Sequence, residues 1–133
     1  MSPASLYFED FEDAAAVTTA ARTVTDADIT AFAQLTGDFV KLHTDEAYAK
    51  TTRFGRRIAH GLYTASLISA VLGTRLPGPG AVYVSQTLNF RAPVRIGDTV
   101  EVTVTVAELD AQRQRARLSC TCRVGDAVVL DGE

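Results

Sequence analysis

The sequence contains little of several residue types that mark specialised proteins. Its 133 residues include one methionine, two cysteines and no tryptophan. Cys120 and Cys122 lie two residues apart in a predicted strand, so their side chains point the same way, which is a poor geometry for a disulfide. With no further cysteine and no histidine nearby they also make a poor zinc site. We therefore predict two buried structural thiols, which suit a reducing cytoplasm.

Strong charge and long apolar runs are also missing. The formal net charge is -3, which gives no reason to expect nucleic acid or an anionic membrane as a partner. The longest uncharged run, Ile58 to Thr74, is short and polar for a membrane span, so a buried core helix is the better interpretation. The sequence does not begin with basic residues followed by an apolar stretch, so we predict no signal peptide. The length fits one domain, residues 1–133.

The first half of the chain predicts mostly helices. Residues 17–24 can form a first strand. The stretch TDADITAFAQLTG then predicts a helix with Thr25 as its N-cap and Gly37 as a left-handed C-cap. Thr44 is predicted to cap a second, short helix. The uncharged run that follows is apolar on every side, unlike a surface helix with one wet face, so the rest of the chain should wrap around it.

Alternation of apolar and polar residues dominates the second half. Val100, Val102 and Val104, for example, alternate with threonine and glutamate. This pattern predicts half-buried antiparallel strands, over residues 81–90, 99–106, 115–124 and 127–131. Helices first and strands afterwards indicate an α+β protein, in which a curved antiparallel sheet folds around the long apolar helix.

The stretch GDFVKLHTDE places Asp38 five residues before His43, one of only two histidines in the chain. Five residues along a helix turn the chain by about 500°, which leaves the two side chains on different faces. In a strand, an odd offset also separates them. If both side chains serve one site, the segment between them must be irregular. Taken alone, Asp38 is better explained as a loop or capping residue.

Two later motifs give this stretch a context, and together they resemble the MaoC-like (R)-specific enoyl-CoA hydratase family. That family has an Asp and a His five residues apart, then F-G-x-x-I-A-H-G, which here begins at Phe54. An F-x-x-P-V-x-x-G-D element follows, here from Phe90 to Asp98. The resemblance covers residues 20–131. It implies the hot-dog fold, an α+β architecture with a curved antiparallel sheet around a long central helix, and a homodimer that extends its sheet across the partner.

The resemblance also implies a reaction. A trans-2-enoyl thioester would take up water to give the (R)-3-hydroxyacyl thioester, or lose it in the reverse direction. His43 is the natural base because imidazole titrates near neutrality, and Asp38 would hold the attacking water with it. Asp38 could also deliver a proton, provided that it is buried. The Gly61 backbone N–H would bind the thioester oxygen, because the first N–H groups of a helix are unpaired.

No metal and no redox cofactor is needed for this chemistry. Coenzyme A or phosphopantetheine would enter as part of the substrate, and the sequence does not distinguish coenzyme A from an acyl carrier protein. Arg56 and Arg57, with Arg53, are candidates to meet their phosphates, the alternative being a solvated basic turn. Ser69 matches a serine that lines the family's site, and Ser66 is the weaker candidate. For both, the alternative is a hydroxyl bonded to its own helix.

One departure from the family pattern lies between the acid and the histidine. The family has D-x-N-P-x-H, whereas this chain has Val40 and Lys41 where Asn and Pro are expected. Proline fixes a backbone angle and asparagine supplies local hydrogen bonds, so the loop must be held differently or a substrate contact has changed. His60 is predicted to be a structural residue bonded to the backbone. The rival functions are a hot-dog thioesterase and a non-catalytic acyl-thioester-binding or partner subunit.

Overall fold

The computed structural model describes residues 17–133, with the side chains described from residue 19 onward. One strand comes first, then four helices, then four strands, which confirms the predicted α+β order. The elements are β1 (Val17–Thr23), α1 (Asp26–Thr36), α2 (Lys41–Thr44), α3 (Glu46–Lys50), α4 (Gly61–Thr74), β2 (Asn89–Phe90), β3 (Thr99–Asp110), β4 (Arg115–Val124) and β5 (Ala127–Gly132).

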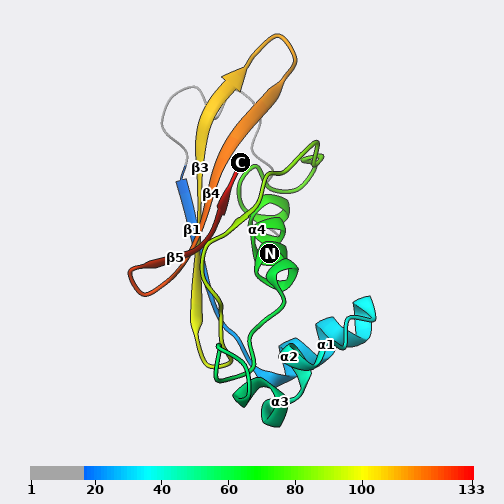
Figure 1. Cartoon of the computed structure of the whole chain (residues 1–133). Helices are drawn as coiled ribbons and strands as arrows, with labels where there is room; N and C mark the ends of the chain where they lie inside the picture. The colour runs from blue at the N-terminus through cyan, green and yellow to red at the C-terminus, as the bar shows by residue number, and fades with distance from the viewer. Residues whose placement is uncertain (1–16) are drawn as a thin grey trace.

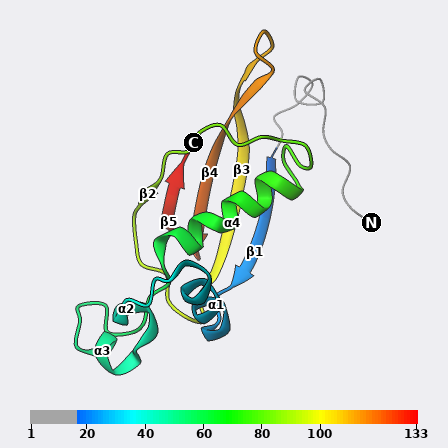
Figure 2. The same ribbon diagram turned by 90° about the vertical axis from the view of Figure 1, so that its right-hand side faces the viewer.

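The five strands form one antiparallel sheet in the order β1-β3-β4-β5-β2. The long helix α4 lies across one face of this sheet, and the three shorter helices gather at one end of it (Figures 1 and 2). Within the described part of the chain, no helix has the length and apolarity needed to cross a membrane. The start of α4 lies near the short helices at one end of the sheet, so Gly61 and the segment with Asp38 and His43 are at the same end of the molecule.

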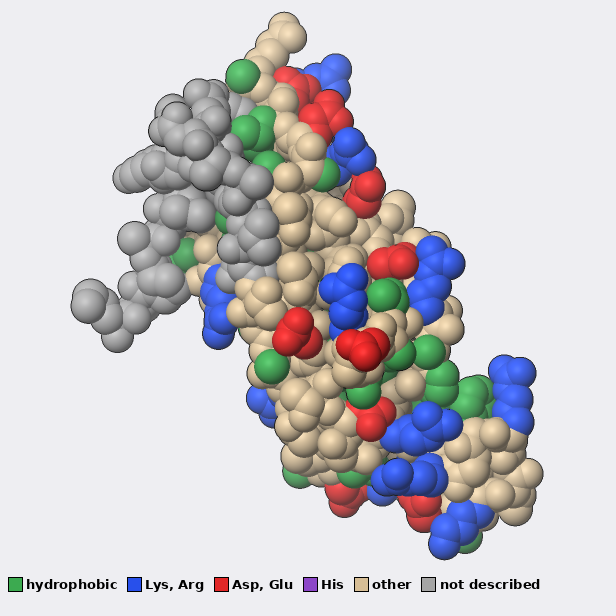
Figure 3. All heavy atoms as spheres, turned by 90° about the vertical axis from the view of Figure 1, so that its left-hand side faces the viewer, with side chains coloured by type: hydrophobic (Ala, Val, Ile, Leu, Met, Phe, Trp, Pro, Cys, Tyr) green, Lys and Arg blue, Asp and Glu red, His purple; other side chains and the backbone are tan. Residues whose placement is uncertain are grey.

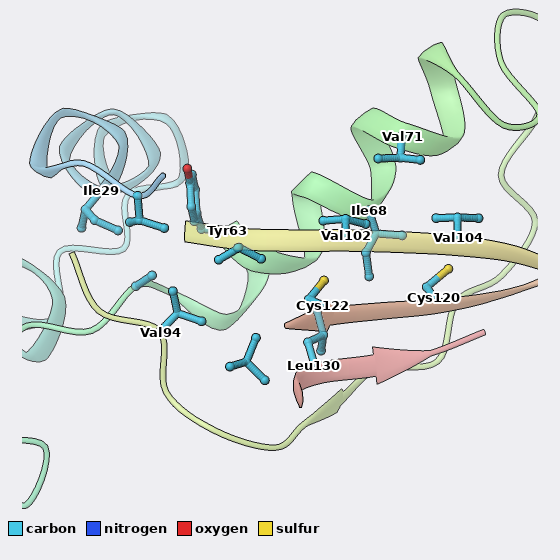
Figure 4. Close-up of a cluster of buried hydrophobic side chains, with 14 of the residues drawn as sticks. Ile29, Tyr63, Ile68, Val71, Val94, Val102, Val104, Cys120, Cys122 and Leu130 are labelled. Carbon is cyan, nitrogen blue, oxygen red and sulfur yellow. The ribbon is translucent and has the colours of Figure 1, made fainter. Parts of the chain in front are cut away.

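The core lies between α4 and the sheet. Val100, Val102 and Val104 of β3 are buried, as their alternation predicted. Cys120 and Cys122 of β4 lie in the same cluster and point toward the helix (Figure 4). Both cysteines are free, and burial raises the pKa of the Cys122 thiol to about 12. The prediction of buried structural thiols is confirmed.

The opposite face of the sheet is polar (Figure 3). Arginine and carboxylate side chains are spread over this face, with only scattered apolar atoms between them. Arg117, for example, reaches Glu108 at 2.8 Å and Glu133 at 2.6 Å. One apolar face and one charged face explain why the strands are recognisable from alternation alone.

Helix α1 has the caps that its sequence predicts. The Thr25 hydroxyl accepts a hydrogen bond from the Asp28 N–H, and the Asp28 carboxylate accepts one from the Thr25 N–H, both at 3.1 Å. Gly37 ends the helix with φ of 80°, and its N–H donates to the Ala33 carbonyl oxygen at 2.8 Å. This left-handed turn, which glycine adopts without steric cost, redirects the chain into Asp38.

The predicted cap of the second helix is wrong by one residue. Asp45, not Thr44, is the N-cap of α3, and its carboxylate accepts from the Tyr48 N–H at 3.0 Å. A charged acceptor at the positive end of a helix makes a stronger cap than a hydroxyl. Thr44 instead ends α2, where its hydroxyl lies 3.3 Å from the Val40 carbonyl oxygen. The single turn α2 was not predicted, and it carries His43.

The strand predicted over residues 81–90 forms only as β2, which pairs with β5. The Thr87 N–H still donates to the Glu133 carbonyl oxygen at 2.8 Å, but no strand of the described chain pairs with residues 81–86, and Val82 and Val84 are 84% and 65% exposed. The alternation of these residues predicts a strand, but the described residues provide no strand beside 81–86.

The prediction that α4 is enclosed on every side is also wrong for the single chain. Tyr63, Ile68 and Val71 face the sheet and are buried, whereas Leu62 is 60% exposed and Ser69 is exposed as well. A five-stranded sheet lies against one face of a helix and leaves the other face uncovered. Part of the apolar surface of α4 is therefore not buried by the elements that the structure describes.

Candidate active site

A cavity of about 340 Å³ lies where the end of α1, the segment after it, the start of α4 and β2 meet. All three residues predicted to be catalytic line it. A carboxylate oxygen of Asp38 and ring nitrogens of His43 and His60 lie within 4.8 Å of one another. The full lining is Phe32, Thr36, Asp38, His43, His60, Gly61, Leu62 and Phe90.

The segment between Asp38 and His43 is irregular, as predicted. After the left-handed Gly37, the Asp38 carboxylate accepts a hydrogen bond from the Val40 N–H at 3.3 Å, which bends the chain back on itself. Val40 is extended, with φ of -54° and ψ of 131°, and the single turn α2 follows. This turn carries His43 round to the side of the carboxylate. Two groups within 4.8 Å can both bind one water molecule.

The tautomer of His43 follows from its partner. Nδ1 lies 2.8 Å from the carbonyl oxygen of Ile58. A carbonyl oxygen only accepts hydrogen bonds, so Nδ1 must carry the proton of the neutral ring. Nε2 therefore holds the free lone pair. This is the arrangement that a general base requires.

Burial lowers the pKa of His43 below its ordinary value of 6.5, and the adjacent His60 ring lowers it further. The hydrogen bond to Ile58 and the charge of Asp38 act in the opposite direction without cancelling the effect. A lowered pKa keeps the imidazole neutral at neutral pH. His43 can therefore accept a proton there.

His60 supports both members of the pair. It is 2% exposed, and its Nε2 donates to the backbone carbonyl oxygen of Asp38 at 2.9 Å. Its ring stacks on that of His43, with centroids 4.1 Å apart, and it also contacts Phe32. The predicted bond from His60 to the backbone is confirmed, and its structural role stays a prediction. Among the described residues, no group pairs with the buried His60 Nδ1.

The start of α4 supplies unpaired donors beside the pair. The helix begins at Gly61, and in the described chain neither the Gly61 N–H nor the Leu62 N–H has an acceptor. A Cβ at Gly61 would lie 2.7 Å from the Phe90 ring, so only glycine fits against that ring in its observed place. Free amides at the positive end of a fourteen-residue helix suit a developing negative charge on oxygen.

The two serines predicted to bind substrate lie outside the cavity lining. Ser66 donates to the carbonyl oxygen of Tyr63 at 2.5 Å, within its own helix, which is the alternative that its sequence left open. Ser69 lies on the exposed face of α4, and its hydroxyl has no hydrogen-bond partner among the described residues. A substrate role for either serine stays a prediction.

The arginines predicted to meet phosphates differ in orientation. Arg57 turns inward, and it donates to the His43 carbonyl oxygen at 2.6 Å and to Asp26 at 2.7 Å. Arg56 is exposed and donates to the Ile96 carbonyl oxygen at 3.2 Å. The guanidinium of Arg53 lies over the ring of Phe54, 4.8 Å from its centroid. A role in phosphate binding remains a prediction for all three.

Four cavity residues were not predicted to be functional: Phe32, Thr36, Leu62 and Phe90. Phe32 lies in the helix predicted between Thr25 and Gly37, and Phe90 in the strand predicted over residues 81–90. Both assignments describe the backbone correctly and miss the lining role. The signals available were proximity in sequence, because Thr36 precedes the Gly37 cap and Leu62 follows Gly61.

Asp38, His43 and His60 are the one grouping of acidic, histidine and cysteine side chains in the described chain that is close enough to consider for a metal. The two rings, however, are stacked with only 29° between their planes. Stacked imidazoles direct their lone pairs side by side and not toward a common point, so this geometry suits a shared water better than an ion. The absence of a metal stays a prediction.

A curved antiparallel sheet against one long helix, with an acid, an imidazole and free amides at the helix start, defines a hot-dog domain with an acid–base site. A MaoC like domain model matches residues 9–126. The chain is 65% identical over 128 residues to the 3-hydroxybutyryl-CoA dehydratase of Methylorubrum extorquens, covering 96% of this chain and 81% of that protein. It is 51% identical over 127 residues to the (R)-specific enoyl-CoA hydratase of Rhodospirillum rubrum, covering 96% and 88%.

The solved structures agree. An R-hydratase from Pseudomonas aeruginosa in the unliganded form superposes with a TM-score of 0.90 at 36% identity, and the match covers 96% of this chain and 82% of that one. The chain therefore belongs to the MaoC-like domain family, and its fold is the hot-dog fold.

Proposed function

We propose that this chain catalyses the reversible hydration of a trans-2-enoyl-CoA to the (R)-3-hydroxyacyl-CoA, with Asp38, His43 and the Gly61 amide as the reacting groups. Its relatives carry the names of this reaction in both directions. The observation that carries the assignment of residues is the position of His43 Nε2. This nitrogen is left free by the bond from Nδ1 to Ile58, and His43 lines one cavity with Asp38 and with Gly61, whose N–H has no acceptor in the described chain.

The reaction uses these groups in a fixed order. A water held between Asp38 and His43 gives a proton to Nε2, and its oxygen bonds to C3 of the enoyl chain. Negative charge then builds on the thioester oxygen, which the Gly61 N–H stabilises with the Leu62 N–H beside it. The Asp38–His43 pair returns a proton to C2, which completes the addition of one water. Dehydration runs through the same steps in reverse.

The decisive experiment measures the enoyl absorbance of crotonyl-CoA with purified protein. The wild type should remove this absorbance, and His43→Gln and Asp38→Asn should each lower kcat by about 10²–10⁴-fold, the usual contribution of general acid–base catalysis. Thermal unfolding of the variants serves as the control for folding. Wild-type rates in both variants would contradict the assigned pair.

The same assay separates the two rival functions. A hot-dog thioesterase would release free coenzyme A, which a thiol reagent detects directly. A non-catalytic subunit would bind the thioester without turnover, or would turn it over only with a second chain present.

The functional unit in the proposal is a homodimer. Its support is the segment 81–86, which pairs with no strand of the described chain and exposes Val82 and Val84, together with the exposed face of α4. Phe90 follows this segment in the sequence, is also exposed, and lines the cavity. A second copy that covers this surface would enclose the site as well, including the exposed Asp38. Asp38 would then be buried, which is the condition for its role as a proton donor.

Sedimentation tests the homodimer. The wild type should sediment as a dimer at micromolar concentration, and Val84→Asp should shift it toward the monomer, because a charge would be buried in the interface. A wild type that stays monomeric at that concentration would remove the dimer from the proposal.

The carrier of the acyl group is proposed to be coenzyme A, because both relatives above are named for it. Basic side chains gather at the end of the molecule that carries α3 (Figure 3). Arg53 and Arg56 follow α3 in the sequence, and they would meet the coenzyme A phosphates. Rates with an acyl carrier protein thioester measured beside crotonyl-CoA distinguish the two carriers. The cytoplasmic location stays a prediction.

A further inference from the structure

Arg57 connects α2 to the start of α1. Its Nε lies 2.6 Å from the carbonyl oxygen of His43 at the active site, and its Nη1 lies 2.7 Å from the Asp26 carboxylate in the first turn of α1. The Arg57 side chain is 13% exposed, whereas that of Asp26 is 69% exposed. The guanidinium therefore lies under the surface and uses its donors on groups of this chain.

Residues 57–59, called the strip here, hold the single turn α2 that carries His43 through several hydrogen bonds. The Ile58 N–H donates to the Leu42 carbonyl oxygen at 3.3 Å, and the Ile58 carbonyl accepts from His43 Nδ1 at 2.8 Å. The strip is itself fixed to the rest of the fold, since Ile58 bridges to Arg95 and the Ala59 N–H donates to the Val94 carbonyl oxygen at 2.7 Å. His43 is thus held against a rigid backbone.

We propose that Arg57 is a positioning residue that sets the orientation of His43 by clamping its carbonyl oxygen to Asp26 of α1. This inference rests on the proposed function, because the orientation matters only if His43 is the base. α2 is a single turn with no side-chain cap at Val40, so little within the turn resists rotation of His43. A planar guanidinium bridges two acceptors at fixed angles, and a lysine ammonium does not.

The clamp and the phosphate role predicted for Arg57 make opposite predictions. A phosphate ligand affects substrate binding, and only for substrates that carry phosphates. A positioning residue affects the reacting step with any thioester, because a base displaced by about 1 Å costs up to about 10²-fold in rate. Crotonyl-CoA and crotonyl-pantetheine, which lacks the phosphates, provide this contrast.

The first measurement is the kinetics of Arg57→Lys with both thioesters. We expect kcat to fall about tenfold with each of them, with KM changed by less than about twofold. Asp26→Asn should lower kcat in the same direction by a smaller factor, because Asp26 is the outer end of the clamp. A rise in KM confined to crotonyl-CoA would overturn the proposal and restore the phosphate role. Unchanged kcat in Arg57→Lys would overturn it as well.

The matched control is Arg22→Lys. Arg22 also pairs with an aspartate in the first turn of α1, Asp28 at 2.7 Å, but its partners Asp28 and Tyr63 both lie outside the cavity lining. Both lysine variants should lower the melting temperature by similar amounts, and only Arg57→Lys should lower kcat. Equal losses of kcat in both would mean that Arg57 acts through general stability, which would contradict the clamp.

A second readout does not depend on turnover. Nitrogen-15 NMR of the imidazoles reports the His43 tautomer, which should be Nδ1–H in the wild type because of Ile58. In Arg57→Lys a fraction of the Nε2–H form should appear, and in Arg22→Lys none. An unchanged tautomer in Arg57→Lys would reject the clamp. If the wild type hydrates neither thioester, the proposed function fails, and the tautomer still tests the clamp separately.

Discussion

Two segments meet at the cavity, and they are built in opposite ways. Residues 37–44 carry Asp38 and His43, are largely exposed, and contain only one turn of helix without a side-chain cap. Residues 57–61 lead into α4, are bridged to Arg95 and Val94, and include the buried His60. Residues 37–44 carry the reactive side chains but have few internal contacts that order them. Residues 57–61 order that segment and carry almost no reactive side chains.

This difference locates the site's rigidity. Asp38 and His43 are held by hydrogen bonds that their backbone carbonyl oxygens accept from His60 and Arg57, and by the bond that His43 Nδ1 donates to Ile58. The first segment can therefore tolerate an unusual sequence, as long as the second is intact. This accounts for a loop that lacks the family's Asn and Pro and yet brings its acid and its imidazole together.

Gly61→Ala should break the second segment with the largest effect. The added methyl would lie 2.7 Å from the Phe90 ring, so either the ring or the start of α4 must move. We expect kcat to fall about 10²-fold, as for the loss of an oxyanion donor. Adding Phe90→Ala removes the collision and should restore part of the rate. No recovery in the double variant would mean that the collision is not the cause.

His60→Phe should have the next largest effect. Phenylalanine keeps a ring against His43 but cannot donate to the Asp38 carbonyl oxygen. We expect a loss in kcat of about tenfold and a loss in stability of about 1 kcal/mol for the missing hydrogen bond. Steady-state kinetics and urea unfolding measure the two quantities. His60→Gln, which retains an N–H donor, should be closer to the wild type, and the reverse order would argue against the bond.

The pH dependence sharpens the comparison further. The lowered pKa of His43 means that the base loses its lone pair only at pH values below 6.5, so the acid limb of kcat/KM should lie below 6.5. His60 contributes to the lowering, so the limb should move upward, toward 6.5, in His60→Phe. An acid limb above 6.5 in the wild type, or a downward shift in the variant, would contradict the assignment.

The smallest effect is expected from repairing the first segment. The family's Asn and Pro would fall at Val40, the N-cap of α2, and at Lys41, its first residue, where they are favoured. Val40 is already extended, which a following proline requires. Val40→Asn with Lys41→Pro should raise the free energy of unfolding by about 1 kcal/mol, measured by urea denaturation. A loss of stability would show that the turn is held against its preference.

The sequence predicted the sheet better than the site. β3, β4 and β5 were located because one apolar face and one charged face produce clear alternation, as Val100, Val102 and Val104 show. The capping residues Thr25 and Gly37 were recognised because their function is local. The strand predicted over residues 81–90 is too long because alternation indicates one buried and one exposed face, and does not show whether a neighbouring strand is present among the described residues.

Within the site, the reactive residues were predicted and their supports were not. Asp38, His43 and Gly61 stand in a recognisable order, and the structure brings them to one cavity. The inward orientation of Arg57 could not be predicted, because the sequence of a basic turn is the same whether its arginine faces solvent or a buried carbonyl oxygen. The stacking of His60 on His43 joins residues that are far apart in the sequence, and no local pattern reports it.

The oxygens that receive hydrogen bonds from His43, Arg57 and His60 at this site belong to the main chain, at Ile58, His43 and Asp38 respectively. Every amino acid carries such an oxygen. Position 58 can therefore drift among apolar residues over evolution without changing which imidazole nitrogen is free to react. Relatives that share few side chains in this strip can still share one proton-transfer geometry, and mutational scanning should find Ile58 tolerant although it selects the reactive nitrogen.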